Sequence, residues 1–165
     1  MSKSPSVVMI GLGYIGLPTA ALIAQNKIAV HGVDINPSVV DTINLGKIHI
    51  VEPELDIAVA EAVKNGYLKA ATTPVEANAY LIVVPTPFKA KNEPDISFVE
   101  AATRAVLPLL KVNDLYIIES TSPIGTTEKM MQLIYAERPE LQDKLNIAYC
   151  PERVLPGNVM YELVN

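Results

Sequence analysis

The sequence predicts an α/β fold, in which a doubly wound and mostly parallel sheet of six strands carries helices on both faces. Three observations lead to this prediction. Short apolar runs of strand length alternate with longer helix-like stretches along the chain. The first apolar run is followed at once by a glycine-rich turn. Half of the 165 residues are hydrophobic, which is enough for the core of one domain.

Each element follows from the local pattern of residues. Residues 7–10 are continuously apolar and rich in β-branched side chains, as expected of a strand buried on both faces. An Ala-, Leu- and Ile-rich segment after the glycine turn predicts a helix over residues 16–26. The helix predicted at 37–45 has Pro37 in its first turn and ends at Gly46. The other strands are expected at 28–33, 67–71, 79–84, 115–119 and 145–149, and the other helices at 52–64, 95–111 and 125–136.

The composition excludes several classes of protein and partner. Ample apolar content, only 8 glycines and a single cysteine exclude disordered, collagen-like and disulfide-stapled chains. The net charge of −5 argues against binding to nucleic acid. No apolar stretch approaches the roughly 18 residues that cross a bilayer, and the amino terminus lacks the pattern of a signal peptide. We therefore expect a cytoplasmic protein without a nucleic acid or membrane partner, and, since the two histidines have no clustered partners, without a metal.

The turn after the first strand contains Gly11, Gly13 and Gly16 in the pattern G-x-G-x-x-G. In such a turn the first glycine permits a tight bend, the second lets the backbone approach a pyrophosphate, and the third allows the helix to pack closely on the strand. Amide groups at the start of the helix then face the phosphates. Because the pattern lies between a predicted strand and a predicted helix, it favours a Rossmann-type dinucleotide site over plain turn chemistry.

Asp34 ends the second predicted strand, at the place where a ribose-binding carboxylate belongs in this type of fold. A carboxylate accepts hydrogen bonds from ribose hydroxyls and repels a 2′-phosphate, and no Arg or Lys lies among the six residues that follow. The sequence therefore favours NAD over NADP. The alternative role for Asp34 is to cap the next helix, but Asn36 serves that purpose as well or better.

Three more predicted strands end in polar residues next to proline. The segments are Pro85-Thr86-Pro87, Glu119-Ser120-Thr121-Ser122-Pro123 and Cys150-Pro151-Glu152-Arg153. Ligands bind outside the carboxyl ends of parallel strands, so we expect these loops to line one crevice. Thr126 and Thr127 begin the next helix, where a hydroxyl either caps the helix or meets an anion. Glu152 either acts on water or substrate or forms a surface pair with Arg153.

Six ordered segments resemble the nucleotide-sugar dehydrogenases, the family that oxidises C6 of a UDP- or GDP-hexose twice with NAD. The segments are GLGYIGLP, GVDINP, IHIVEPEL, VPTPF, ESTSPIGTTE and YCPERVLPG, and together they extend over essentially the whole chain. Pro-Glu-Arg-Val stands where UDP-glucose dehydrogenases typically show Pro-Glu-Phe-Leu, which favours the branch that acts on UDP-N-acetylhexosamines. The resemblance thus implies UDP-N-acetylmannosamine as the substrate and a homodimeric full-length enzyme.

The resemblance also implies roles for single residues in the cofactor site. The backbone of Tyr14 and Ile15 would contact the NAD pyrophosphate, and Asp34 would hold a ribose of NAD. Thr86 and Thr121 would line the nicotinamide side.

For the chemistry, the resemblance implies that Glu152 assists the water that hydrolyses a thioester intermediate, and that Arg153 and Val154 touch the nucleotide-sugar. Thr127 is a further residue expected near the cofactor. One departure from the family is Val39, where several relatives carry a basic residue.

The family takes its nucleophilic cysteine and catalytic lysine from downstream regions that residues 1–165 do not match. We interpret Cys150, at the end of a predicted buried strand, as structural. We therefore expect residues 1–165 to be the NAD-binding domain of a longer enzyme and to be inactive alone. Three alternatives stay open: a UDP-glucose 6-dehydrogenase, a single-oxidation dehydrogenase of a hydroxy acid, and a non-catalytic NAD-sensing domain.

Overall fold

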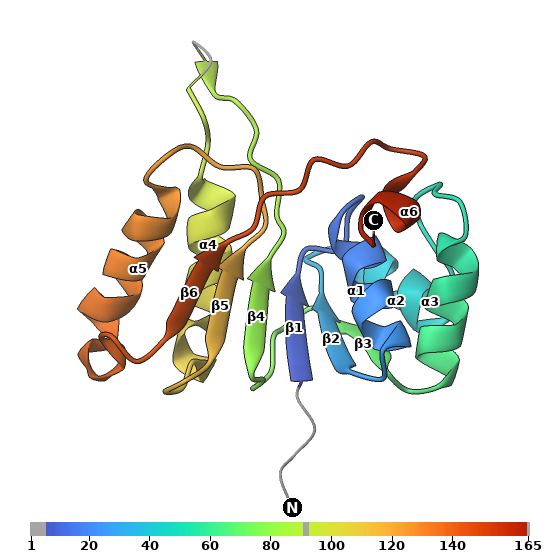
Figure 1. Ribbon diagram of the computed structural model, residues 1–165, viewed down its shortest axis with the longest axis horizontal. Coiled ribbons are helices and arrows are strands. Elements are labelled where there is room, and N and C mark those ends of the chain that lie inside the picture. The colour runs from blue at the N-terminus through green and yellow to red at the C-terminus, as the bar shows by residue number, and fades with distance from the viewer. Residues whose placement is uncertain (1–5, 91–92, 165) are drawn as a thin grey trace, which may run out of the picture.

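The computed structural model describes residues 6–90 and 93–164, and they form a six-stranded sheet with helices on both faces (Figure 1). The strand order is β3-β2-β1-β4-β5-β6, and each neighbouring pair is parallel. The strands are β1 (Ser6–Ile10), β2 (Ala29–Val33), β3 (Leu68–Ala71), β4 (Ala79–Ile82), β5 (Leu115–Ile118) and β6 (Asn146–Tyr149). This arrangement confirms the predicted doubly wound fold.

Two sets of helices cover the two faces of the sheet. The first set is α1 (Gly16–Gln25), α2 (Pro37–Asn44) and α3 (Leu55–Lys64), and the second set is α4 (Ser97–Val106) and α5 (Thr126–Glu137). A short helix, α6 (Val159–Glu162), packs against α1. The chain crosses from the first set to the second between β3 and β5, so the central pair β1 and β4 lies where the strand order reverses.

Successive residues of the central strand enter different cores. Val7 and Met9 face the core under α1, α2 and α3, whereas Val8 and Ile10 face the core under α4 and α5. Side chains alternate across a strand, so a strand covered on both faces needs apolar residues at every position. This requirement explains the unbroken apolar run at residues 7–10.

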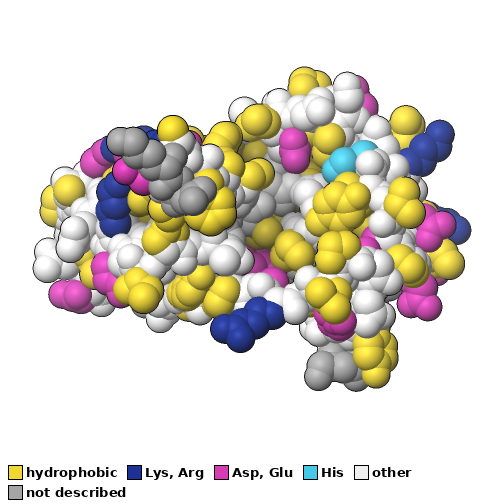
Figure 2. All heavy atoms as spheres, turned by 90° about the horizontal axis from the view of Figure 1, so that it is seen from above, with side chains coloured by type: hydrophobic (Ala, Val, Ile, Leu, Met, Phe, Trp, Pro, Cys, Tyr) yellow, Lys and Arg dark blue, Asp and Glu magenta, His cyan; other side chains and the backbone are white. Residues whose placement is uncertain are grey.

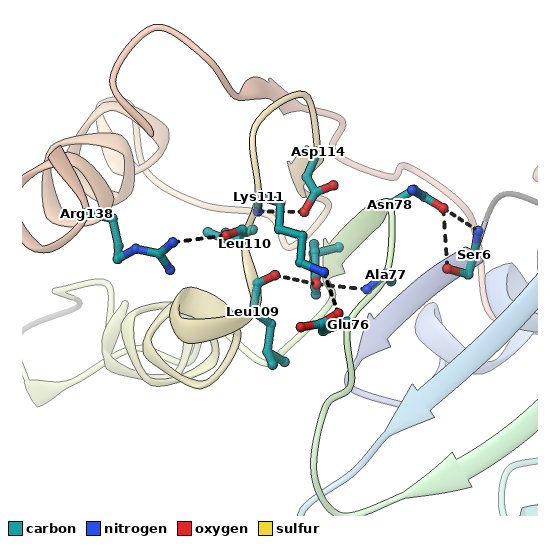
Figure 3. Close-up of polar contacts among 10 residues, drawn as sticks. Ser6, Glu76, Ala77, Asn78, Leu109, Leu110, Lys111, Asp114 and Arg138 are labelled. Carbon is teal, nitrogen blue, oxygen red and sulfur yellow. Dashed lines mark hydrogen bonds and ion pairs between the residues drawn. The ribbon is translucent and has the colours of Figure 1, made fainter. Parts of the chain in front are cut away.

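Polar contacts join the segments at the amino ends of the strands, on the side away from the glycine turn (Figure 3). We call this end of the sheet the amino edge and the opposite end, where the strands finish, the carboxyl edge. Asn78 Oδ1 accepts a hydrogen bond from the amide of Ser6 at 3.1 Å, which joins the beginnings of β4 and β1. Lys111 pairs with Glu76, and the amide of Lys111 donates to the carboxylate of Asp114 at 2.8 Å. These bonds hold the strands in register at this edge and leave the opposite edge to the loops.

The segment after β6, residues 150–158, crosses the carboxyl edge of the sheet and leads into α6 (Figure 1). Its far end is held by Glu52, a side chain only 4% exposed, in the connection between α2 and α3. The Glu52 carboxylate accepts hydrogen bonds from the amides of Gly157 at 2.8 Å and Val159 at 2.7 Å. We call residues 150–158 the crossing segment; neither its anchor nor α6 is among the sequence-based predictions.

Two predictions about elements are wrong. The last strand is not buried: β6 lies at the edge of the sheet, its residues are half-buried or exposed, and Cys150 after it is exposed. The helix expected over 95–111 is shorter, since α4 ends at Val106 and a 3₁₀ turn, Leu107–Leu109, follows it. Pro108 has no amide hydrogen for the α-helical bond, which explains the change.

Candidate functional site

The loops that follow β1, β2, β4, β5 and β6 all meet at the carboxyl edge of the sheet, as parallel strands require. Figure 2 shows this face from above, with a hollow between its two halves, hydrophobic side chains on both sides of the hollow, and most Lys and Arg side chains away from its middle. These loops, together with the first turns of α1 and α5, carry all of the site residues that the sequence analysis predicts. The structure therefore places these residues at one edge.

The three glycines of the turn after β1 have different surroundings. Gly11 has a φ of +99°, and a Cβ added there would lie 2.1 Å from the carbonyl oxygen of Val83. A Cβ at Gly16 would lie 1.9 Å from the carbonyl oxygen of Gly11. Gly13, in contrast, has nothing within 4 Å of its added Cβ. Gly11 and Gly16 are thus required for the fold, whereas the space beside Gly13 is open to a ligand.

Backbone donors lie beside that open space. Within the described residues, the amides of Tyr14 and Ile15 donate no hydrogen bond, and helix α1 begins at the next residue, Gly16. Amides at the start of a helix attract anions, because they lack partners inside the helix and lie at the positive end of its dipole. This part of the turn has the donors that a pyrophosphate needs.

Asp34 lies directly after β2 and links its loop to the glycine turn. Its Oδ2 accepts the amide hydrogen of Leu12 at 3.2 Å, and its Oδ1 accepts that of Asn36 at 2.9 Å. Helix α2 is capped by Asn36, whose side chain accepts from the amide of Ser38 at 3.0 Å. Capping therefore does not account for Asp34, and each of its oxygens keeps a lone pair for a hydroxyl donor.

Thr86 and Thr121, from the loops after β4 and β5, are in contact. Thr86 Oγ1 donates to the carbonyl oxygen of Thr121 at 2.6 Å. Ser120 supports this contact, because its hydroxyl accepts from the amide of Val84 at 2.8 Å and lies 2.7 Å from the carbonyl oxygen of the same residue. The two loops thus continue the pairing of β4 and β5 beyond the ends of the strands.

The two threonines at the start of α5 differ in their contacts. Thr126 is buried and its hydroxyl donates to the carbonyl oxygen of Pro123 at 2.8 Å, so it does not cap the helix. The residue at the cap position is Gly125, with a φ of +88°. Thr127 is half-buried, and none of the hydrogen bonds among the described residues joins its side chain to the loop of Thr86 and Thr121.

Glu152, Arg153 and Val154 lie on the crossing segment. Glu152 is half-buried and lines a hollow of about 360 Å³ with Glu119 and with residues of α1, whereas Arg153 is exposed and Val154 half-buried. Within the described residues, Arg153 forms no ion pair with Glu152. The surface pair that the sequence allowed is therefore not formed.

Glu119 belongs to the site, although the sequence analysis assigns it no role. It follows β5, is 4% exposed, and its Oε1 accepts a hydrogen bond from the hydroxyl of Thr19 on α1 at 3.1 Å. Its Oε2 is buried and has no hydrogen-bond partner among the described residues. Burial, and to a smaller extent the nearby charge of Glu152, raise the pKa of Glu119 to about 7, against the opposing effect of the Thr19 bond. A signal was present in the sequence, since Glu119 is a charged residue directly after an apolar strand.

Cys150 lies near the same carboxylates. Although Cys150 is exposed, partial desolvation by the surrounding protein, and then the charges of Glu152 and Glu119, raise the pKa of its thiol, which weakens it as a nucleophile. In the described part of the chain, no group of three or more His, Cys, Asp or Glu side chains is arranged to hold a metal ion. No described helix is long and apolar enough to cross a membrane.

Residues 5–165 match the family described as "UDP-glucose/GDP-mannose dehydrogenase family, NAD binding domain". The chain belongs to this family. Among its relatives, the UDP-N-acetyl-D-mannosamine dehydrogenase of Escherichia coli K12 is 57% identical over 96% of this chain and 40% of its own length. An NDP-N-acetyl-D-galactosaminuronic acid dehydrogenase from Ralstonia nicotianae is 52% identical over the same shares.

A solved structure supports the family at the level of the fold. The UDP-D-ManNAc dehydrogenase from Pyrococcus horikoshii superimposes with a TM-score of 0.88 at 39% identity, over 96% of this chain and 38% of that one. The chain therefore spans about 40% of the length of the curated family members that it matches. The shared part is the NAD-binding domain of the family.

The residues of this family member fit NAD. Gly13 leaves space at the turn, Tyr14 and Ile15 offer backbone donors, and Asp34 offers carboxylate oxygens at the end of the adjacent strand. These are the three features that a pyrophosphate and its neighbouring ribose require.

Proposed function

We propose that this chain holds NAD at the carboxyl edge of its sheet and serves as the cofactor domain of a nucleotide-sugar 6-dehydrogenase. The reaction would convert UDP-N-acetylmannosamine, two NAD and water to UDP-N-acetylmannosaminuronate and two NADH. The observation that carries the proposal is the open space at Gly13, next to two amides that have no partner among the described residues and in a turn that Leu12 joins to the Asp34 carboxylate. Bound NAD would supply the acceptor for the hydride that leaves C6.

The cofactor is assigned to residues along this edge. Tyr14 and Ile15 bind the pyrophosphate through their amides, and Asp34 accepts hydrogen bonds from ribose hydroxyls. Thr86 and Thr121 line the nicotinamide side, and their mutual hydrogen bond of 2.6 Å supports this assignment because it fixes the position of both loops. Thr127, in the first turn of α5, is the remaining residue assigned to the cofactor.

The crossing segment is assigned to the substrate. Glu152 takes a proton from the water that hydrolyses the thioester, and its place beside Glu119 in a hollow along α1 supports this role. Arg153 and Val154 contact the nucleotide-sugar. The nucleophilic cysteine and the catalytic lysine belong to a region beyond the matched domain, so the described residues alone bind NAD without turnover.

The choice of sugar rests on the Pro-Glu-Arg-Val sequence at 151–154 and on the name of the Escherichia coli relative. The Ralstonia relative, with a different named sugar at 52% identity, shows that overall similarity separates these substrates poorly. A UDP-glucose 6-dehydrogenase is the second candidate, because the family that the chain matches is named for UDP-glucose and GDP-mannose dehydrogenases. We further propose that the complete enzyme is a cytoplasmic homodimer that supplies a uronic acid for surface polysaccharide.

The variant Gly13→Ala tests the NAD site. An added Cβ meets nothing within 4 Å, so the variant should fold like the wild type. The same methyl group would occupy the space through which the pyrophosphate approaches the backbone, so we expect calorimetric titration with NAD to show an affinity at least about tenfold weaker.

Gly66→Ala is the matched control, because Gly66 also has nothing within 4 Å of an added Cβ but lies at the amino edge before β3. Its φ of +76° makes alanine unfavourable there, so this variant should lose stability and keep its affinity for NAD. Equal NAD affinities for wild type and Gly13→Ala, or no binding by the wild type at millimolar NAD, would contradict the proposed site.

A further inference from the structure

Within the described part of the chain, the hollow beside Glu119 and Glu152 is lined by these two acidic side chains and by no basic one. Its other lining residues are Thr19, Leu22, Ile23, Asn26, Ile28, Leu163 and Val164. Helix α1 contributes no charged residue to it, and Arg153, next to Glu152 in sequence, does not line it. Two ionised carboxylates in such a place would repel each other without a compensating cation.

The hydrogen bonds of Glu119 show which of its oxygens is available for a proton. Oε1 already accepts the Thr19 hydroxyl hydrogen at 3.1 Å. Oε2 is buried and lacks a partner among the described residues. A buried carboxylate oxygen without a donor is costly, whereas a protonated one carries no charge and can donate. Glu152 is half-buried, so water can solvate its charge.

We propose that Glu119 is a positioning residue that holds a proton on its carboxyl group as the pH rises towards neutrality, so that over this range the hollow does not carry the charge of Glu119 beside that of Glu152. The identity of the proton holder rests on the geometry of the hollow. Its use in hydrolysis rests on the proposed function, because Glu152 is the residue assigned to accept a proton from water.

The titratable groups that face Glu119 are few. Within the described residues they are Glu152 and Cys150, both in the segment after β6, while α1 presents the neutral Thr19. The Glu152 charge and the Thr19 hydrogen bond act on Glu119 in opposite directions: the first raises its pKa and the second lowers it. Substitutions of Glu152 and of Thr19 should therefore shift the pKa of Glu119 in opposite directions, which a general disturbance of the fold would not do.

The test is a titration of the glutamate carboxyl carbons by NMR on this chain with isotope label, in which the Glu119 signal is identified by its loss in Glu119→Gln. We expect the wild-type signal to titrate near pH 7. Glu152→Gln should shift that midpoint to lower pH, since it removes a like charge, and Thr19→Val should shift it to higher pH, since it removes a donor to the carboxylate. Glu61→Gln, an exposed position on α3, is the matched control and should leave it unchanged.

The proposal fails if Glu119 titrates at the ordinary value of 4.5, or if Glu152→Gln moves its midpoint no more than Glu61→Gln does. A parallel titration of the same wild-type sample with NAD tests the proposed function separately from the protonation of Glu119. Binding of NAD with an ordinary Glu119 titration overturns only the proton assignment. A midpoint near 7 in a protein that does not bind NAD leaves the proton assignment intact and removes its proposed use.

Discussion

Glu119 links the burial of one side chain to the pH dependence of folding. Its pKa is about 7 in the folded protein, against an ordinary value of 4.5 that the unfolded chain should show. At a pH below both values the Glu119 carboxyl group is protonated in the folded and in the unfolded state. Its ionisation then does not lower the free energy of unfolding. As the pH rises between them, only the folded protein keeps the proton, so the free energy of unfolding falls by up to about 1.4 kcal/mol per pH unit.

Replacing Glu119 by glutamine should remove this dependence. We expect Glu119→Gln to match the wild type in stability well below pH 4.5 and to exceed it above pH 7, by roughly 3 kcal/mol if the whole shift is realised. Urea unfolding of both proteins across that pH range gives the difference, in which the other titrating groups cancel. A difference that does not change with pH would show that Glu119 has an ordinary pKa in the folded state.

The sequence predicts the position and surroundings of some site residues better than those of others. Gly11, Gly16 and Asp34 were predictable, because a turn and the end of the next strand are defined by nearby residues. The environment of Glu119 was not, since it depends on Thr19, 100 residues away in sequence. A pattern of residue types shows that a carboxyl group ends a strand, but tertiary packing decides whether that group is buried.

At the scale of elements, the crossing segment and α6 depend on Glu52. Helix α6 has only four residues, too few to be stable by its own hydrogen bonds. The buried Glu52 carboxylate accepts two of the amides before and within its first turn, at 2.8 and 2.7 Å. This contact fixes the far end of the segment that carries Glu152, so it also orients part of the site.

Glu52→Gln tests this anchor. Glutamine offers one acceptor oxygen instead of two, so the amide of Gly157 or that of Val159 loses its partner, at a cost of about 1 to 3 kcal/mol where that amide is buried. Hydrogen exchange at the Val159 amide should become at least about tenfold faster, while the amides of β1 exchange as in the wild type. Glu54→Gln, an exposed neighbour in the same connection, serves as the control. Unchanged exchange at Val159 in Glu52→Gln would mean that other contacts hold α6 in place.

An element could be predicted from the sequence when its own residues define it, and could not when it depends on distant contacts. The six strands and the helices between them were predictable from periodicity, because each has its own apolar pattern. Helix α6 was not, because it has less than two turns and depends on a distant carboxylate. The exposure of β6 was also missed: an apolar run of four or five residues does not reveal whether a strand lies inside a sheet or at its edge.

At the scale of the whole molecule, the two edges of the sheet have different roles. The amino edge is fastened by side-chain bonds, such as Ser6 to Asn78 and Lys111 to Asp114 (Figure 3). The carboxyl edge gathers the loops that carry the glycine turn, Asp34 and Glu152. The separation allows one edge to maintain the fold while the other presents groups to a ligand.

The central claim is that NAD binds at the carboxyl edge of the sheet, and locating bound NAD by NMR tests it most directly. In amide NMR spectra of the labelled chain, addition of NAD should shift the signals of Gly13, Tyr14, Ile15 and Ile35 most strongly. The amides of Ser6 and Asn78, at the fastened edge, should keep their positions. Saturable shifts at the glycine turn and beside Asp34 would confirm the site. Shifts that gather at the amino edge, or no shifts with the fold intact, would contradict it.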